Sequence, residues 1–371
     1  FQAEDGIRYL VRSRGLGDVY KRQIPIIAQP DLGTGLVYIF LGLMFLFICG
    51  MHRFYFIGMG VFGVLLSPLI YTFGLTSYQK GRIISWFSSD QTLSEKWNIL
   101  QSEISIGSGM FIFSFNNKDI EVFYHVPPSY AASSKVVFAM HGGSRDAEGV
   151  RNNMIQKSID YNFILIAPKF SSSNFSLGDG YNLGNVYVDG DNPSTSTLND
   201  ENEWSFSIIE PLFDSVKSSL SLESEKYNLF GFSAGAQFVH RFIQFKPDAR
   251  FDKVVAGAAG WYTVPDNSIP FPYGYDNSIL ISTNLSNLLS SDLYIQVGAL
   301  DNNPNSVGLR HNEYADAQGL NRVTRAVHFF ETGQNISESS NYDFNWSLHI
   351  IQGAGHNLIP NADNACNLMF N

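Results

Sequence analysis

The stretch that decides the fold is Tyr227–Ala236, which reads YNLFGFSAGA. Its first half is apolar, and the pentad GFSAG separates this half from a segment with helical character at residues 237–245. The pattern predicts a buried strand, a sharp turn at Ser233 and a helix. Small residues on both sides of the serine allow strand and helix to approach closely. We therefore expect the Ser233 hydroxyl to lie at a helix N-terminus, where the amide of Ala234 could stabilise an oxyanion.

The chain of 371 residues has a formal net charge of −10, and this charge is unevenly distributed. Residues 1–109 contain 9 Lys and Arg against 7 Asp and Glu, whereas residues 110–371 contain 15 against 27. Phosphate contacts need a basic face, so the acidic part argues against a nucleic-acid partner. The two cysteines, Cys49 and Cys366, are too few for a disulfide framework or a cysteine-based metal site.

Residues 1–23 show no apolar periodicity and lack the apolar central region of a signal peptide. They resemble the translated read-through of a sequencing adapter, a contaminant of metagenomic reading frames. We therefore predict a non-native leader and exclude it from the fold. The alternative is a basic leader close to a membrane.

Two apolar runs at residues 33–51 and 55–75 are separated by the pair His52-Arg53. Each run is close to the length of roughly 20 residues that a helix needs to cross a hydrocarbon core. We predict a transmembrane helical hairpin with its basic tip in the cytoplasm and both flanks on the outer side. The alternative is a pair of buried core helices.

The motif QPDLGT at residues 29–34, with YQKGR at 78–82 and ILQSEISIGSG at 99–109, resembles the SEDS family of cell-wall polymerases, RodA and FtsW. The resemblance covers residues 24–109 and implies a role for the carboxylate of Asp31 in glycan polymerisation from lipid-linked precursors. Two helices cannot close the cavity of a multi-helix membrane enzyme. We therefore expect a truncated and inactive fragment.

The character of the sequence changes after Gly109. Residues 110–127 alternate apolar and polar positions around an Asn-Asn pair, which predicts a β-hairpin that enters a separate domain, residues 110–371. The junction has no linker rich in Pro, Ser or Gly, and this favours a spliced reading frame over an evolved fusion.

In this domain, short apolar runs alternate with helical periodicity, which predicts an α/β fold: a mostly parallel sheet with helices on both faces. Ligands of such sheets bind beyond the carboxyl ends of the strands. Besides the strand before Ser233, the predicted strands are 135–140, 163–167, 254–258, 293–297 and 348–351, and the predicted helices include 152–160 and 205–220.

The loop HGGS at residues 141–144 follows the first of these strands. A glycine loop can direct several backbone amides to one point, which suits the second half of an oxyanion hole. We favour Gly143 as the donor and keep Gly142 beside it. The alternative is a plain turn from strand to helix.

Asp301 ends the run LYIQVGALD, where an acid beyond a strand could orient an imidazole. Its rivals, Asp316 and Asp343, have no preceding apolar strand. His356 lies in a Gly-rich loop after the strand at 348–351. The chain order Ser, Asp, His is the order that a nucleophile elbow in this fold requires. The other histidines of the domain that we considered are predicted to pack in the core, lie in a strand or belong to the glycine loop: His240, His349 and His141.

Several segments resemble bacterial α/β-hydrolases related to polyhydroxybutyrate depolymerases and feruloyl esterases. They are residues 141–143, 181–185, 204–213, 231–242, 259–262 and 298–304. The resemblance implies the α/β-hydrolase fold and ester hydrolysis, with Phe232 in place of the more usual His. With Ser233, His356 and Asp301 as a triad, the reaction would proceed through an acyl-enzyme and would need no metal or organic cofactor.

We therefore predict a serine esterase that acts on a small or polymeric ester and is joined to a SEDS fragment. One alternative is that function follows the N-terminal segment, as a RodA/FtsW-like peptidoglycan glycosyltransferase or cell-shape protein. Another is a non-catalytic binding domain tethered to a membrane through residues 33–75. The aromatic residues of segments 170–187 and 261–275 could line a substrate cleft or pack in the core. The compartment stays open; a genuine fusion would place the hydrolase on the outer side of the membrane.

Overall fold

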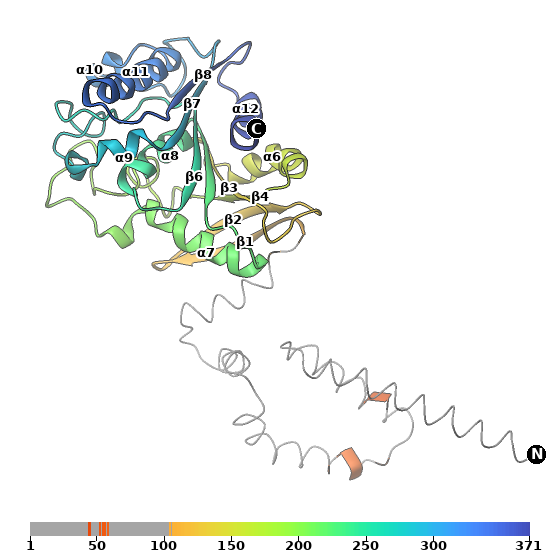
Figure 1. Ribbon diagram of the computed structural model, residues 1–371. Helices are drawn as coiled ribbons and strands as arrows, with labels where there is room; N and C mark the ends of the chain where they lie inside the picture. Colours follow the sequence, from red (N-terminus) through yellow and green to blue (C-terminus); the bar gives the residue numbers. More distant parts are fainter. Residues whose placement is uncertain (1–43, 46–51, 53, 57, 59–103, 105) are drawn as a thin grey trace, which may run out of the picture. The chain divides into compact units, whose positions relative to one another are not determined.

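The computed structural model describes residues 44–45, 52, 54–56, 58, 104 and 106–371 (Figure 1). The predicted leader, Asp31, Cys49 and nearly all of the predicted transmembrane hairpin lie outside the described residues. In the part of the chain that is described, no helix combines the length and hydropathy of a membrane span. The chain divides into two compact units, 1–98 and 99–371, and the sheet described next lies in the second.

Eight strands form one sheet in the order β1-β2-β4-β3-β5-β6-β7-β8 (Figure 1). The pairs β1–β2 and β2–β4 are antiparallel, and all other neighbours are parallel. The predicted mostly parallel sheet is confirmed. The strands are β1 (Gly107–Phe115), β2 (Lys118–Val126), β3 (Val136–Met140), β4 (Ile164–Pro168), β5 (Tyr227–Phe232), β6 (Phe251–Gly257), β7 (Asp292–Gly298) and β8 (Ser347–Ile351).

The β-hairpin predicted at residues 110–127 is formed by β1 and β2. Asn116 and Asn117 make its turn, with φ of 46° and 61°. Positive φ at both central residues is the condition of a type I′ turn, and Asn tolerates this conformation better than most residues. Strand β1 begins at Gly107, so the sheet includes residues before the predicted domain start at 110. That boundary stays a prediction.

Helices cover both faces of the sheet. One cluster of buried residues joins the sheet to α6 and α12, and a larger one joins it to α7, α8 and α11. The α-helices of this unit are α6 (Ala147–Tyr161), α7 (Ile209–Leu220), α8 (Ala234–Phe245), α9 (Leu285–Leu289), α10 (Glu313–Ala317), α11 (Arg322–Ser340) and α12 (Leu358–Phe370). Short 3-10 helices lie at Glu201–Glu203, Ser205–Ile208 and Ile279–Ser282, so the predicted helix at 205–220 begins as a 3-10 turn.

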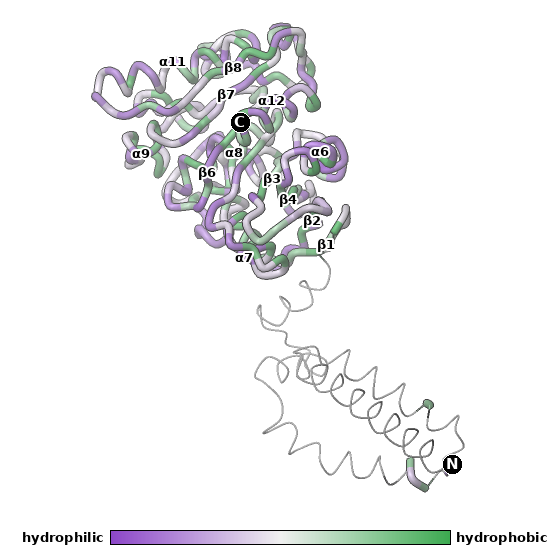
Figure 2. The backbone as a smooth tube through the Cα atoms, turned by 45° about the vertical axis from the view of Figure 1, so that its right-hand side comes forward, coloured by the Kyte–Doolittle hydropathy of each residue, from purple (hydrophilic) through white to green (hydrophobic). Residues whose placement is uncertain are grey.

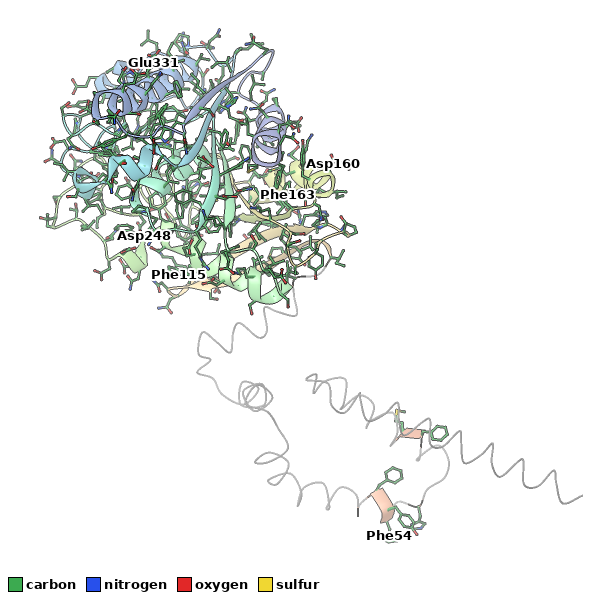
Figure 3. All side chains as sticks on the ribbon, in the orientation of Figure 1. Phe54, Phe115, Asp160, Phe163, Asp248 and Glu331 are labelled. Carbon is green, nitrogen blue, oxygen red and sulfur yellow. The ribbon has the colours of Figure 1, made fainter. Side chains whose placement is uncertain are left out.

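The pleat of strand β3 distributes its side chains between these two clusters. Val137 and Ala139 belong to the cluster under α6 and α12, whereas Phe138 and Met140 belong to the other. Successive side chains of a strand point to opposite faces, so a strand covered on both sides is apolar throughout. In Figure 2, β3 is coloured as hydrophobic, whereas α6, which covers one face of the sheet, is more hydrophilic. The acidic side chains of Asp160 on α6 and Glu331 on α11 lie at the outer surface (Figure 3).

The aromatic residues of segments 170–187 and 261–275 pack in the larger cluster. Phe170, for example, is fully buried and stacks on Tyr181, with ring centroids 5.2 Å apart. The sequence left open whether these aromatic residues line a substrate cleft or pack in the core, and their burial favours core packing. The buried aromatic residues of these segments are Phe170, Phe175, Tyr181, Tyr187, Trp261, Tyr262, Phe271, Tyr273 and Tyr275.

Phe138 offers a test of this core. Its ring is fully buried, with its centroid 5.2 Å from that of Tyr227 and 6.5 Å from that of Phe213. We expect Phe138→Ala to lower the free energy of unfolding by about 3 to 5 kcal/mol, because it leaves a cavity. Urea unfolding of the full chain measures the loss. The control is Val307→Ala at a fully exposed position, where a change within about 0.5 kcal/mol is expected. Equal losses in the two variants would contradict the assigned core.

Candidate active site

Ser233 occupies the sharp turn between β5 and α8, with φ of 57° and ψ of −113°. Positive φ is uncommon for a residue with a side chain and marks a strained backbone. The Ser233 amide donates to the carbonyl of Gly257 in β6 at 2.8 Å, which ties the turn to the sheet. The strain is thus held between two neighbouring strands and the start of a helix.

The two glycines of the pentad are required by packing. A Cβ on Gly231 would lie 2.1 Å from the carbonyl oxygen of Gly235, and a Cβ on Gly235 would lie 2.2 Å from the carbonyl oxygen of Met140. Both contacts are with backbone, which cannot move aside as a flexible side chain could. The close approach predicted from the sequence is therefore present.

Three of the predicted site residues form one hydrogen-bonded line. His356 Nε2 lies 3.1 Å from the Oγ of Ser233, and His356 Nδ1 lies 2.6 Å from Oδ2 of Asp301. Asp301 is buried, and the His356 side chain is partly exposed. With Nδ1–H donating to the carboxylate, Nε2 is free to accept from the serine hydroxyl. The structure thus brings together residues that are far apart in the sequence.

Parallel strands bring the three residues to one edge of the sheet. Ser233, Asp301 and His356 follow β5, β7 and β8, whose carboxyl ends meet there. A backbone hydrogen bond joins the loops that carry Asp301 and His356: the amide of Leu300 donates to the carbonyl of Ala354 at 2.8 Å. The separation of acid and base is therefore fixed by backbone as well as by side chains.

The rival residues are engaged elsewhere. Asp316 pairs with His311 at 2.7 Å and with Arg325 at 3.0 Å. His240 is buried in α8, where its Nδ1 donates to the Ala236 carbonyl, and His349 lies in β8. Asp343 is exposed in the loop after α11.

The predicted glycine loop lies beside the serine. A Cβ on Gly142 would lie 3.7 Å from the Cβ of Ser233, whereas Gly143 has open space at that position. Ala234 is the first residue of α8, as expected. The loop and the helix N-terminus therefore border the same space next to the hydroxyl.

His141 anchors this loop in the core, a role that the sequence did not reveal. Its Nδ1 donates to the Gly142 carbonyl and its Nε2 accepts from the amide of Phe170, both at 3.0 Å. The hydroxyl of Tyr181 donates to the His141 carbonyl at 2.7 Å. Burial lowers the pKa of His141 to about 4, against the opposing effect of the Gly142 bond. The ring is therefore neutral at pH 7, as its acceptor nitrogen requires.

A cavity of about 270 Å³ opens beside the hydrogen-bonded line. Asp146 is the acidic residue of its lining, which contains no Lys or Arg among the described residues. Phe232 borders the cavity and packs on the His356 ring, with centroids 4.8 Å apart. The lining residues are Gly142, Gly143, Ser144, Asp146, Gly149, Val150, Asn153, Phe232, Ser233, His356 and Leu358.

Arg322 contacts this site and was not predicted. Its Nη1 donates to Oδ1 of Asp301 at 3.1 Å, and both side chains are buried. Only one signal in the sequence could have drawn attention to it, a basic residue at the start of a helix. No group of three or more potential metal ligands occurs within the described ranges.

The fold can be compared with solved structures. Poly(aspartic acid) hydrolase-1 from Sphingomonas sp. KT-1 is 30% identical with a TM-score of 0.68, and the match covers 72% of this chain and 100% of that chain. This chain belongs to the same family of α/β-hydrolases. LpqC, a poly(3-hydroxybutyrate) depolymerase from Bordetella parapertussis, is 26% identical with a TM-score of 0.68, over 76% of this chain and 94% of that chain. The predicted α/β-hydrolase fold and the predicted enzyme class, a carboxylic ester hydrolase, are confirmed. The transmembrane hairpin, the other part of the fold prediction, lies almost wholly outside the described residues and stays a prediction.

The N-terminal part matches a different family. The family model FTSW_RODA_SPOVE, described as "Cell cycle protein", matches residues 21–120. Peptidoglycan glycosyltransferase MrdB from each of two strains of Helicobacter pylori is 38% identical over 89 residues, or 24% of this chain. The chain spans 22% of the length of these relatives. The predicted resemblance to RodA and FtsW is confirmed.

The elbow glycine can be tested by substitution. We expect Gly235→Ala to destabilise the protein by about 3 kcal/mol, since its Cβ would overlap a backbone oxygen. Thermal unfolding should show a clearly lower midpoint. The control is Gly143→Ala, whose Cβ would enter open space and should leave the midpoint nearly unchanged. Similar midpoints for both variants would contradict the packing requirement.

The buried His141 predicts a dependence of stability on pH. Its folded pKa of about 4 lies below the unfolded value of 6.5, so unfolding takes up a proton between these pH values. Its stabilising contribution is complete above pH 6.5 and falls by up to about 3 kcal/mol as the pH drops to 4. His141→Asn should lower the number of protons taken up on unfolding in this pH range by close to one, so that the unfolding free energy falls less steeply with decreasing pH. Identical pH slopes of the unfolding free energy in wild type and variant would contradict the prediction.

Proposed function

We propose that residues 106–371 hydrolyse neutral carboxylic esters, with Ser233 as nucleophile, His356 as general base and acid, and Asp301 as the group that orients His356. The observation that carries the proposal is the continuous line of two hydrogen bonds, 3.1 Å and 2.6 Å long, at the border of the cavity. A serine hydroxyl is a weak nucleophile until an adjacent base accepts its proton.

The reaction proceeds in two steps. His356 takes the proton of Ser233 as Oγ attacks the ester carbonyl, and Asp301 stabilises the imidazolium that forms. The amide of Ala234, with those of Gly142 and Gly143, stabilises the oxyanion of the tetrahedral intermediate. His356 then protonates the alcohol that leaves. Water, activated by the same imidazole, cleaves the acyl-enzyme and releases the acid.

The charge of the site favours a neutral substrate. The cavity is lined by apolar side chains such as Val150 and Leu358, with Asp146 as its acidic residue. Residues 110–371 carry 15 Lys and Arg against 27 Asp and Glu, so the domain repels polyanions. The name of LpqC refers to a neutral polyester, whereas that of poly(aspartic acid) hydrolase-1 refers to a polyanion. We therefore favour hydroxyalkanoate esters over poly(aspartic acid).

The alternatives have less support. The chain spans 22% of the length of the glycosyltransferases that it matches, so the activity of those whole proteins is not carried over, and Asp31 lies outside the described residues. A membrane-tethered binding domain would not require the hydrogen-bonded line from Ser233 to Asp301. Placement of the hydrolase on the outer side of a membrane depends on the predicted transmembrane hairpin of residues 33–75, and stays a prediction.

Ester hydrolysis by the full chain tests the proposal. We expect p-nitrophenyl esters and 3-hydroxybutyrate oligomers to be cleaved, and Ser233→Ala to lower kcat by about 10⁴-fold or more. The matched control is Ser144→Ala, a serine that lines the same cavity but is not part of the hydrogen-bonded line. Its kcat should stay within about tenfold of wild type, because it takes no part in the proton transfer.

Two results would overturn the proposal. Hydrolysis that survives Ser233→Ala would remove the assigned nucleophile. Faster cleavage of poly(aspartic acid) than of 3-hydroxybutyrate oligomers would leave the serine mechanism in place and refute the neutral substrate.

A further inference from the structure

Arg322 and His356 share the carboxylate of Asp301. Oδ2 accepts from His356 Nδ1 at 2.6 Å, and Oδ1 accepts from Arg322 Nη1 at 3.1 Å. The Asp301 and Arg322 side chains are 1% and 4% exposed, so water screens this pair little. Each oxygen of the carboxylate thus has its own charged or chargeable partner.

The position of Arg322 is unfavourable by local rules. It is the first residue of α11, where the helix dipole disfavours a cation. Its Nε is buried and finds no hydrogen-bond partner among the described residues. A buried cation with an unsatisfied donor is costly unless an anion compensates it. The anion that compensates Arg322 is Asp301, to which it donates a hydrogen bond. This pairing indicates that Arg322 has a role at the site rather than in the stability of the helix.

The other charged groups nearby are held by different partners. Arg325, one turn further along α11, pairs with Asp316 at 3.0 Å and donates to the Gly260 carbonyl at 2.7 Å. Asp316 also binds His311.

The hydroxyl of Tyr262 lies near the pair. Burial raises its pKa most, Asp301 raises it further, and Arg322 lowers it. The phenol therefore stays neutral, and Arg322 is the cation that faces Asp301.

We infer that Arg322 is a positioning residue of the proposed hydrolysis, which fixes the Asp301 carboxylate so that Oδ2 faces His356 and supplies the counter-charge of that carboxylate. This inference rests on the proposed function. Without the guanidinium, the carboxylate could rotate, and kcat would fall while substrate binding in the cavity would stay. The uncompensated negative charge would also stabilise the imidazolium form of His356, so the acid limb of the pH–activity profile would move to higher pH.

The test is the pH dependence of kcat and KM for the full chain, with a p-nitrophenyl ester as substrate. For Arg322→Gln we expect kcat to fall by about 10- to 100-fold at nearly constant KM, since small displacements of an orienting group cost rates of this order. The acid limb should move up by about one pH unit. Arg322→Lys keeps the charge and should return the acid limb close to its wild-type position.

The matched control is Arg325→Gln, which removes a buried arginine of the same helix that is bonded to Asp316. It should leave the acid limb in place even if it lowers stability. An equal shift in Arg325→Gln, or no shift in Arg322→Gln, would overturn the inference.

A comparison of Asp301→Asn with a double variant covers the case in which Arg322→Gln does not fold. Asp301→Asn combined with Arg322→Gln removes both buried charges and leaves no unpaired ion. We expect its kcat to equal that of Asp301→Asn alone within about threefold, because a residue that acts through Asp301 has no effect once the carboxylate is gone. A further loss clearly greater than about threefold in the double variant relative to Asp301→Asn would refute the role. If wild type lacks activity that depends on Ser233, the proposed function fails instead.

Discussion

The backbone contact between Gly235 and Met140 constrains the whole active-site edge. It brings the first turn of α8 against the end of β3, with no room for a side chain between them. Ser233 can therefore occupy its strained conformation only while β3, β5 and α8 are packed together. Strain of about 1 to 3 kcal/mol at such a position persists when the surrounding structure over-determines it. Here the two apolar clusters on the faces of the sheet provide that structure.

The same edge is organised by buried polar contacts. His141 ties the glycine loop to Phe170 and Tyr181, and its neutral ring serves as donor and acceptor at once. On the other side, Arg322 and His356 hold the two oxygens of Asp301. Both sets of buried hydrogen bonds hold parts of the site in place, and a buried polar network of this kind is stable only when its partners are in place.

The local elements could be predicted because their signals are local. The apolar runs of β3 and β7 and the Asn116-Asn117 turn follow from propensity and periodicity. The candidate site was also accessible, since Ser233, Asp301 and His356 each follow a strand in the order that the fold requires. The aromatic residues of the segments 170–187 and 261–275 could not be assigned, because a buried aromatic and one that lines a cleft have the same sequence pattern.

The sequence by itself determined the mostly parallel sheet, the turn at Ser233 and the short set of residues that could act with it. The resemblance of the N-terminal segment to RodA and FtsW also follows from the sequence alone, because it rests on short sequence motifs. Only the tertiary structure decided the distances at which Ser233, His356 and Asp301 meet, that His141 anchors the glycine loop, and that Arg322 binds Asp301. Such contacts join residues of different elements, and their geometry depends on how the strands and helices pack, which no local pattern encodes.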